Sequence, residues 1–129
     1  MKKITIVILI ISLTSCNFLF QIYSDKKLTE NINSEYLKNK KPVNLRKLTN
    51  FEWDKFIVIG CYQNIKQIEK ENNLDLSNIY YNGIESSDWF ELLVFLKDKK
   101  SIKICEINMN VNLDLDKSFY FYNSRIQKN

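Results

Sequence analysis

Residues 55–62, KFIVIGCY, place six β-branched, aromatic or thiol side chains in a run that only one glycine interrupts. Such a run predicts a strand buried on both faces, because a strand with one wet face would alternate apolar and polar residues. Gly60 within the run indicates a bulge or a close neighbouring backbone. We therefore expect this strand to lie in the centre of a sheet, with the rest of the core packed around it.

The second half of the chain predicts the remaining strands. Residues 89–97 (WFELLVFLK) and 102–105 (IKIC) flank a short charged turn, which is the pattern of a β-hairpin. From Cys105 onward the alternation of apolar and polar residues continues in the opposite phase, which indicates one inserted bulge residue near Ile104. Residues 119–122 (FYFY) predict a last strand.

Two helices are expected beside these strands. One is indicated by apolar residues at helical spacing, Leu28, Ile32 and Tyr36, although a disordered polar linker fits the same composition. The other follows a capping-box pattern, Asn64 with Gln67, and runs to about Glu71. Residues 43–49 (VNLRKLT) are ambiguous between a short strand and a loop. The predicted class is α+β, an antiparallel sheet of about four strands covered on one face by one or two helices.

The composition excludes several kinds of chemistry. The sequence has no histidine, which is the commonest general base and transition-metal ligand, so catalytic triads with histidine are excluded. Two glycines, Gly60 and Gly83, lie too far apart for a phosphate-binding loop. The formal charge of +4 falls to +2 without Lys2 and Lys3, which is too small for a nucleic-acid-binding protein. We expect no catalytic residues, metal or cofactor.

Near the N-terminus, the residues Leu13, Thr14, Ser15 and Cys16 follow a run of apolar side chains that begins at Ile4, with two lysines in front. Charged and apolar regions in this order are typical of a secretory signal. The four residues resemble the bacterial lipobox in all positions. The resemblance implies cleavage before Cys16 and acylation of its thiol, which would anchor the chain to the membrane on the exported side of a bacterial envelope.

An uncleaved transmembrane anchor is the alternative, because apolar residues continue to Tyr23 and the whole stretch approaches the roughly 20 residues needed to span a bilayer. Polar residues between Ser12 and Gln21 favour a signal peptide. The predicted organisation is a signal peptide over residues 1–15, a lipidated tether over residues 16–27 and a single α+β domain over residues 28–129.

The stretch from Trp53 to Tyr62, together with the Leu-Leu-Val-Phe sequence at 92–95, resembles a group of small uncharacterised bacterial lipoproteins. In that group a Trp-Asp-Lys strand precedes a Pro-Tyr pair, a short helix and a Val-Phe hairpin. Cys61 stands where the group usually has proline, so the turn there is expected to differ. The resemblance implies a membrane-anchored α+β domain and no reaction.

Three residues are candidates for binding: Trp53, Asp54 and Trp89. Aromatic anchors are enriched at protein interfaces, so either tryptophan would suit a partner. The competing interpretation makes Trp53 a core residue and Asp54 a cap of a turn, and it applies in the same way to Trp89 with Asp88. The favoured function is therefore a non-catalytic envelope lipoprotein that binds a protein partner. The rival function is a carboxylate-based hydrolase of wall or glycan polymers, with Glu52 and Asp54 or Glu85 and Asp88 as its pair.

Once Cys16 is acylated, Cys61 and Cys105 are the remaining thiols. A disulfide between them would suit an oxidising compartment, provided that the two positions face each other on neighbouring strands. Reduced cysteine also packs well as a small buried apolar residue. We favour two free thiols.

Overall fold

The computed structural model describes residues 20–115 and, for the backbone alone, residues 119–123. The described helices are α2 (Lys26–Asn39), α3 (Leu45–Leu48), α4 (Ile65–Asn72) and the 3-10 helix η1 (Ile84–Ser86). The strands are β1 (Lys55–Ile59), β2 (Phe90–Lys97), β3 (Lys100–Asn108) and β4 (Phe119–Asn123). The predicted α+β class is confirmed. The expected signal peptide and Cys16 lie outside the described residues.

The sheet has the strand order β3-β2-β1-β4. β1 pairs antiparallel with β2, and β2 with β3, whereas β4 pairs parallel with β1. The antiparallel strands therefore number three, and the prediction of about four was wrong on this point. The reason is the connection after β3, which crosses from one edge of the sheet to the other, since a crossover connection produces a parallel neighbour. On this path Leu113 pairs with Val43.

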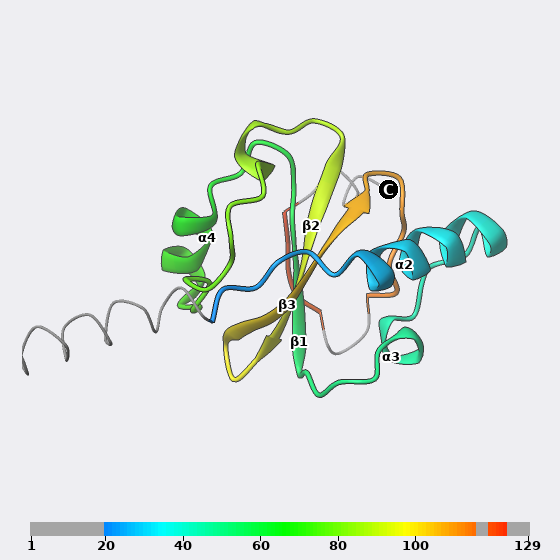
Figure 1. Ribbon diagram of the computed structural model, residues 1–129, viewed down its shortest axis with the longest axis horizontal. Coiled ribbons are helices and arrows are strands. Elements are labelled where there is room, and N and C mark those ends of the chain that lie inside the picture. The colour runs from blue at the N-terminus through cyan, green and yellow to red at the C-terminus, as the bar shows by residue number, and fades with distance from the viewer. Residues whose placement is uncertain (1–19, 116–118, 124–129) are drawn as a thin grey trace, which may run out of the picture.

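Helices cover both faces of the sheet, and not one face as predicted. Figure 1 views the sheet almost edge-on, with α4 on one side and α2 and α3 on the other. Phe56 and Val58 of β1 pack in the cluster that includes α2 and α3, whereas Ile57 and Ile59 pack in the cluster on the α4 side. All of these residues are buried. Burial on both faces explains the continuous apolar run that marked β1 in the sequence.

The hairpin of β2 and β3 carries the predicted bulge, at a different residue. Phe95 pairs with Lys103 and Leu96 with Ser101, so Ile102 is the inserted residue. The sequence pointed to Ile104 because Ile104 and Cys105 are adjacent apolar residues. In the structure they belong to the clusters on opposite faces, which a sheet covered on both sides permits without a bulge.

The folded part of the chain begins before Leu28. Ile22 pairs with Ile79, Ser24 pairs with Ile104 of β3, and α2 starts at Lys26. Residues 21–27, expected in a tether, are thus built into the domain. The expected helix is present as α2, and it begins there because the Asp25 carboxylate accepts the Leu28 N–H at 2.9 Å.

Residues 43–49, ambiguous between strand and loop, contain α3. Its N-cap is Asn44, which accepts the Lys47 N–H at 3.3 Å. The predicted helix after Asn64 is α4, and the Asn64 side chain accepts the Gln67 N–H at 2.9 Å. It ends where Asn73 adopts a left-handed conformation with φ of 52°.

Candidate functional site

Trp53 is 4 % exposed and belongs to the core. Its ring meets the Phe95 ring edge to face, with the centroids 5.1 Å apart, and its indole N–H donates to Thr49 Oγ1 at 2.9 Å. The Arg46 guanidinium lies 3.5 Å from the ring centroid and donates to the Trp53 carbonyl at 2.7 Å. Every part of the side chain is thus used inside the domain. The structure places Trp53 where a partner of the folded protein cannot reach it.

Asp54 stabilises the turn between β2 and β3. Its Oδ2 accepts the Asp98 N–H at 3.0 Å, and Asp98 and Lys99 both have positive φ, at 49° and 65°. A two-residue turn with positive φ at both positions matches the twist of the hairpin strands. This conformation is unfavourable for residues other than glycine and asparagine. The carboxylate compensates by fixing the N–H of the first turn residue. Asp54 is therefore the turn cap that the sequence offered as one interpretation.

Trp89 is the predicted binding residue that the structure leaves accessible. Its side chain is 66 % exposed, and its ring contacts Phe90 edge to face, with the centroids 4.7 Å apart. Trp89 immediately precedes β2, and its backbone N–H donates to Ser87 Oγ at 3.4 Å. An indole that is mostly exposed presents a large apolar surface.

Tyr62 lies at the same end of the sheet. The register of β1 and β2 pairs Ile59 with Leu92, and Cys61 Sγ lies 3.3 Å from the carbonyl of Phe90, so the antiparallel strands bring Tyr62 toward Trp89. Tyr62 is itself exposed and has a φ of 63°. A bulky residue in the left-handed region is uncommon, and such strain is concentrated at functional sites.

Met109 completes this group of side chains. It follows Asn108, which pairs with Phe90, and its sulfur lies 3.7 Å from Cys61 Sγ. Cys61 and Met109 are both half-buried. Tyr, Trp and Met are enriched at the centres of protein interfaces. We call this group, Cys61, Tyr62, Trp89 and Met109, the end-of-sheet surface.

A second set of exposed aromatic residues lies where the chain enters the fold. It consists of Phe20, Tyr23, Tyr80 and Tyr81, which we call the tyrosine surface. The Tyr23 and Tyr80 rings are 4.6 Å apart and tilted by 35°. Two backbone hydrogen bonds fix this arrangement, from Ile22 N to Asn78 O at 2.8 Å and from Tyr80 N to Ile22 O at 3.0 Å.

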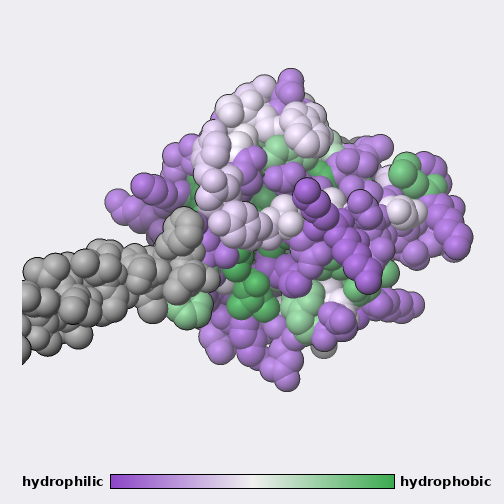
Figure 2. Space-filling view, in the orientation of Figure 1, coloured by the Kyte–Doolittle hydropathy of each residue, from purple (hydrophilic) through white to green (hydrophobic). Residues whose placement is uncertain are grey.

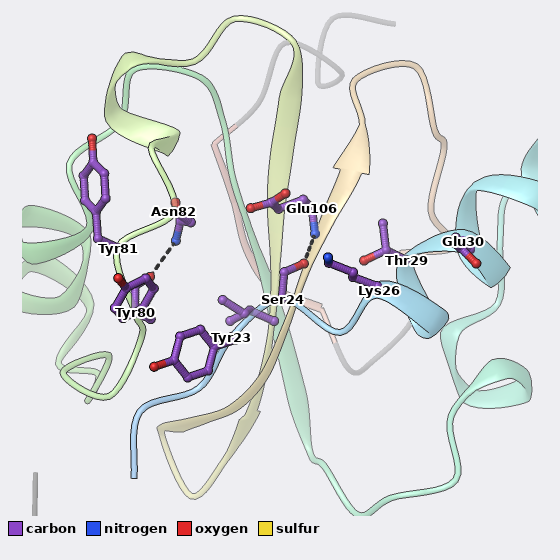
Figure 3. A pocket seen from close by; sticks show the side chains of 10 residues that line it. Tyr23, Ser24, Lys26, Thr29, Glu30, Tyr80, Tyr81, Asn82 and Glu106 are labelled. Carbon is purple, nitrogen blue, oxygen red and sulfur yellow. Dashed lines mark hydrogen bonds between the residues drawn. The ribbon is translucent and has the colours of Figure 1, made fainter. Parts of the chain in front are cut away.

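The tyrosine surface borders a pocket of about 360 Å³. Figure 3 shows Tyr23 and Tyr80 on one side of this pocket, and Lys26, Thr29 and Glu30 from the start of α2 on the other. Glu106 of β3 lines it as well. One ammonium group and two carboxylates among these residues leave no excess of positive charge in the pocket.

A larger hollow of about 570 Å³ lies between α4 and residues 76–85, and it shares Tyr80 and Tyr81 with the first pocket. The two carboxylates that line this hollow accept hydrogen bonds from backbone N–H groups. Glu85 Oε1 accepts the Ile65 N–H at 3.4 Å, and Glu69 Oε2 accepts the Leu76 N–H at 2.5 Å. The walls are otherwise mainly apolar and aromatic, so the hollow extends the tyrosine surface and does not resemble an acidic cleft.

The sequence offered two pairs of carboxylates for hydrolysis, and also Asp114 and Asp116 for calcium, with a solvated strand face as the favoured interpretation of the latter. Asp54 and Glu85, one from each expected pair, accept backbone N–H groups. No cluster of three His, Cys, Asp or Glu side chains that could hold a metal ion occurs in residues 20–115. Asp114 is exposed, as the solvated strand face predicted, and Asp116 lies outside the described residues.

Cys61 and Cys105 are separate free thiols. Cys105 lies in β3 and Cys61 follows β1, with β2 between them. Strands are spaced by about 4.8 Å, so two strand spacings exceed the range of roughly 4.4–6.8 Å between the Cα atoms of a disulfide. Burial raises the pKa of the Cys105 thiol to about 12, although a hydrogen bond with Thr29 opposes this effect.

An ion pair also holds residues 21–25, the segment that leads into α2. Lys103 Nζ of β3 lies 2.7 Å from the Asp25 carboxylate. The pKa of Asp25 lies below its ordinary value of 3.8, first because the carboxylate accepts the Leu28 N–H and then because of the hydrogen bond from Lys103. This pair joins the N-cap of α2 to the edge strand.

Comparison with known proteins gives no relative: no protein-family model, curated protein or solved structure matches the chain. Among the described residues, none of the helices has both the length and the apolar character needed to cross a bilayer.

Sequence reasoning missed most of the exposed aromatic residues. Trp89 was singled out, whereas Tyr62 was expected in the central strand, and Tyr80 and Tyr81 were not among the candidates. The left-handed conformation of Tyr62 leaves no pattern in the sequence. The sequence did contain a signal that Tyr80 and Tyr81 are exposed, namely their position directly before the turn residues Asn82 and Gly83. Turns lie at the surface, so aromatic residues beside them tend to lie outside the core.

Proposed function

We propose that this chain is a non-catalytic lipoprotein of the bacterial envelope, anchored through acyl chains on Cys16, and that its domain binds a protein partner through the end-of-sheet surface. The anchor is supported by the lipobox, by the apolar run before it and by the resemblance to small bacterial lipoproteins. Two or more acyl chains give durable attachment to a bilayer, whereas one chain gives reversible binding.

The observation that carries the partner proposal is the exposure of Trp89, at 66 %, beside the exposed and strained Tyr62. A solvent-exposed indole contributes little to folding, and a left-handed tyrosine costs about 1–2 kcal/mol. Both side chains would contribute to binding if a partner buried them. Trp and Tyr are enriched among the interface residues whose truncation weakens binding by about 2 kcal/mol or more.

The surrounding residues support a protein and not a small molecule as the ligand. The described pockets lie at the tyrosine surface and along the helices, and Trp89 lines none of those at the tyrosine surface. An exposed aromatic surface of this kind suits a macromolecular interface. The half-buried Met109 adds a side chain that adapts its shape to a partner.

Photocrosslinking in intact cells tests this proposal. A photoreactive amino acid is placed at position 89, at position 62, and at the exposed position 39 on α2 as a control. We expect one discrete protein adduct of the same mass from positions 62 and 89 and none from position 39. Adducts that are equally abundant at all three positions, or absent at 62 and 89, would contradict the proposal.

A further inference from the structure

The entry of the chain into the fold and the tyrosine surface coincide. Phe20 is the first described residue and is 69 % exposed, and Tyr23, three residues later, is 57 % exposed. The hydrogen bonds of Ile22 with Asn78 and Tyr80 hold this segment against the loop that carries Tyr80 and Tyr81. In Figure 2 weakly polar residues, drawn in pale colours, form a band on one face of the domain.

The proposed anchor lies very close to this surface. Asn17, Phe18 and Leu19 separate Cys16 from Phe20. Four residues span at most about 14 Å, whatever their conformation. If Cys16 is acylated, its backbone is held at the lipid headgroups, so Phe20 cannot leave the neighbourhood of the bilayer. The other end of α2 lies roughly 20 Å further along the helix axis, at 1.5 Å per residue.

The chemistry of the surface also suits a bilayer. Tyrosine and tryptophan are enriched at membrane–water interfaces, where the ring enters the apolar boundary and the hydroxyl stays among the headgroups. Four exposed aromatic side chains around one entry point exceed the scattered single residues that are normal on a soluble surface. The pocket beside them contains Lys26 but also Glu30 and Glu106, so attraction to anionic lipid is not required.

We propose that Phe20, Tyr23, Tyr80 and Tyr81 form a membrane-resting surface, which lies in the headgroup region of a phospholipid bilayer and fixes the orientation of the anchored domain. This inference rests on the proposed acylation of Cys16. It assigns the two aromatic surfaces different occupants: lipid for the tyrosine surface and protein for the end-of-sheet surface.

The test uses the full chain, acylated in cells and purified in detergent. An environment-sensitive fluorophore is attached after Tyr81→Cys and, as a matched control, after Asn39→Cys on the distant end of α2. Both chains carry Cys61→Ser, which removes the accessible native thiol, while Cys16 is acylated and Cys105 is buried. Each protein is reconstituted into vesicles of pure phosphatidylcholine, and a second set contains lipids with a quencher at the level of the headgroups. Mass spectrometry of each preparation records acylation of Cys16 separately.

We expect the emission at position 81 to shift to shorter wavelength in vesicles and to be quenched several-fold more than the emission at position 39, at low and at high salt. With Cys16 acylated, equal quenching at both positions overturns the membrane-resting surface and leaves the anchor intact. A shift that occurs in native membranes but not in pure lipid shows that a protein covers the tyrosines, which also overturns it. Absence of acylation refutes the proposed anchor, and this inference with it.

A second pair of variants tests the residues directly. Tyr80→Ser with Tyr81→Ser removes two rings of the membrane-resting surface, whereas Tyr62→Ser removes one ring of the end-of-sheet surface. The fluorophore is placed after Tyr23→Cys in both. We expect quenching at position 23 to fall several-fold in the first variant and to stay unchanged in the second. Equal quenching in both variants overturns the role assigned to Tyr80 and Tyr81.

Discussion

The backbone N–H of Tyr62 donates to the carbonyl of Ile84 at 3.0 Å, and Tyr62 has a φ of 63°. This bond joins the end of β1 to the 3-10 helix η1 and turns the chain toward α4. The exposed Tyr62 thus lies at the end of the sheet where Trp89 precedes β2. A glycine would adopt this conformation without steric cost, so the presence of tyrosine calls for a reason outside the fold.

Tyr62→Gly separates the backbone from the side chain. Relief of the left-handed strain stabilises the fold by about 1–2 kcal/mol, and the greater freedom of the unfolded glycine offsets roughly 0.5–1 kcal/mol of this gain. We therefore expect a free energy of unfolding equal to or up to about 1.5 kcal/mol above that of the wild type, measured by urea denaturation. Tyr81→Gly, at an exposed position without positive φ, is the control and should lower it. A large loss in Tyr62→Gly would show that the ring supports the fold.

The two tryptophans should differ sharply in their effect on stability. Trp53→Ala removes a buried ring, its hydrogen bond with Thr49 and its contact with Arg46, and we expect a loss of about 3–5 kcal/mol. Trp89→Ala removes an exposed ring, so the loss should stay within about 1 kcal/mol. Thermal or urea unfolding measures both. Similar losses in the two variants would contradict the assignment of Trp53 to the core and Trp89 to a surface.

Asp25→Asn tests the ion pair with Lys103. Asparagine caps a helix about as well as aspartate, so the substitution removes the charge and keeps the cap. Because the pKa of Asp25 is lower in the folded chain, the ionised carboxylate stabilises the fold above its ordinary pKa of 3.8, and this contribution is lost as the pH falls below that value. We expect the wild type to exceed Asp25→Asn in stability near pH 7 and the difference to shrink progressively as the pH falls below 3.8. Asp88→Asn, at an exposed position, is the control, and a difference for Asp25→Asn that is independent of pH would contradict the pair.

The thiols should react in a fixed order. Cys61 is half-buried at the end of the sheet, whereas Cys105 is buried and its pKa is raised to about 12. Thiolate is the nucleophile, so a folded chain carrying Cys16→Ser should be alkylated at Cys61 and not at Cys105. Unfolding without a reductant should then add a second alkyl group, which intact mass records. A denatured chain that takes up no alkyl group would show a disulfide.

The sequence predicted the elements whose pattern is local. The apolar run of β1, the hairpin of β2 and β3, and the cap at Asn64 all depend on neighbours in the chain, and each was found in place. The bulge was predicted at Ile104, two residues after its actual position at Ile102. The prediction failed because adjacent apolar residues occur without a bulge in a sheet that is covered on both faces. The pairing of β4 parallel to β1 depends on the path between residues 109 and 118, which no periodicity records.

The candidate site was predictable only in part. Trp53 and Trp89 look alike in the sequence, since each lies next to an aspartate and just before a strand. The two side chains differ in burial because α3 and the residue after it bring Arg46 and Thr49 into contact with Trp53, whereas residues 84–87 leave Trp89 exposed. The entry segment was expected to be a tether because apolar residues at its start are followed by the charged residues 25–27. Its hydrogen bonds with Asn78 and Tyr80 are long-range contacts, and these build it into the domain.

Acylation of Cys16 is the claim on which the anchor and the membrane-resting surface depend. Metabolic labelling with a fatty-acid analogue tests it most directly, in cells that express the wild type or Cys16→Ser at equal levels. We predict that the label enters the wild-type chain and that Cys16→Ser accumulates as an unlabelled precursor of higher mass. Equal incorporation of the label into both chains would contradict the account.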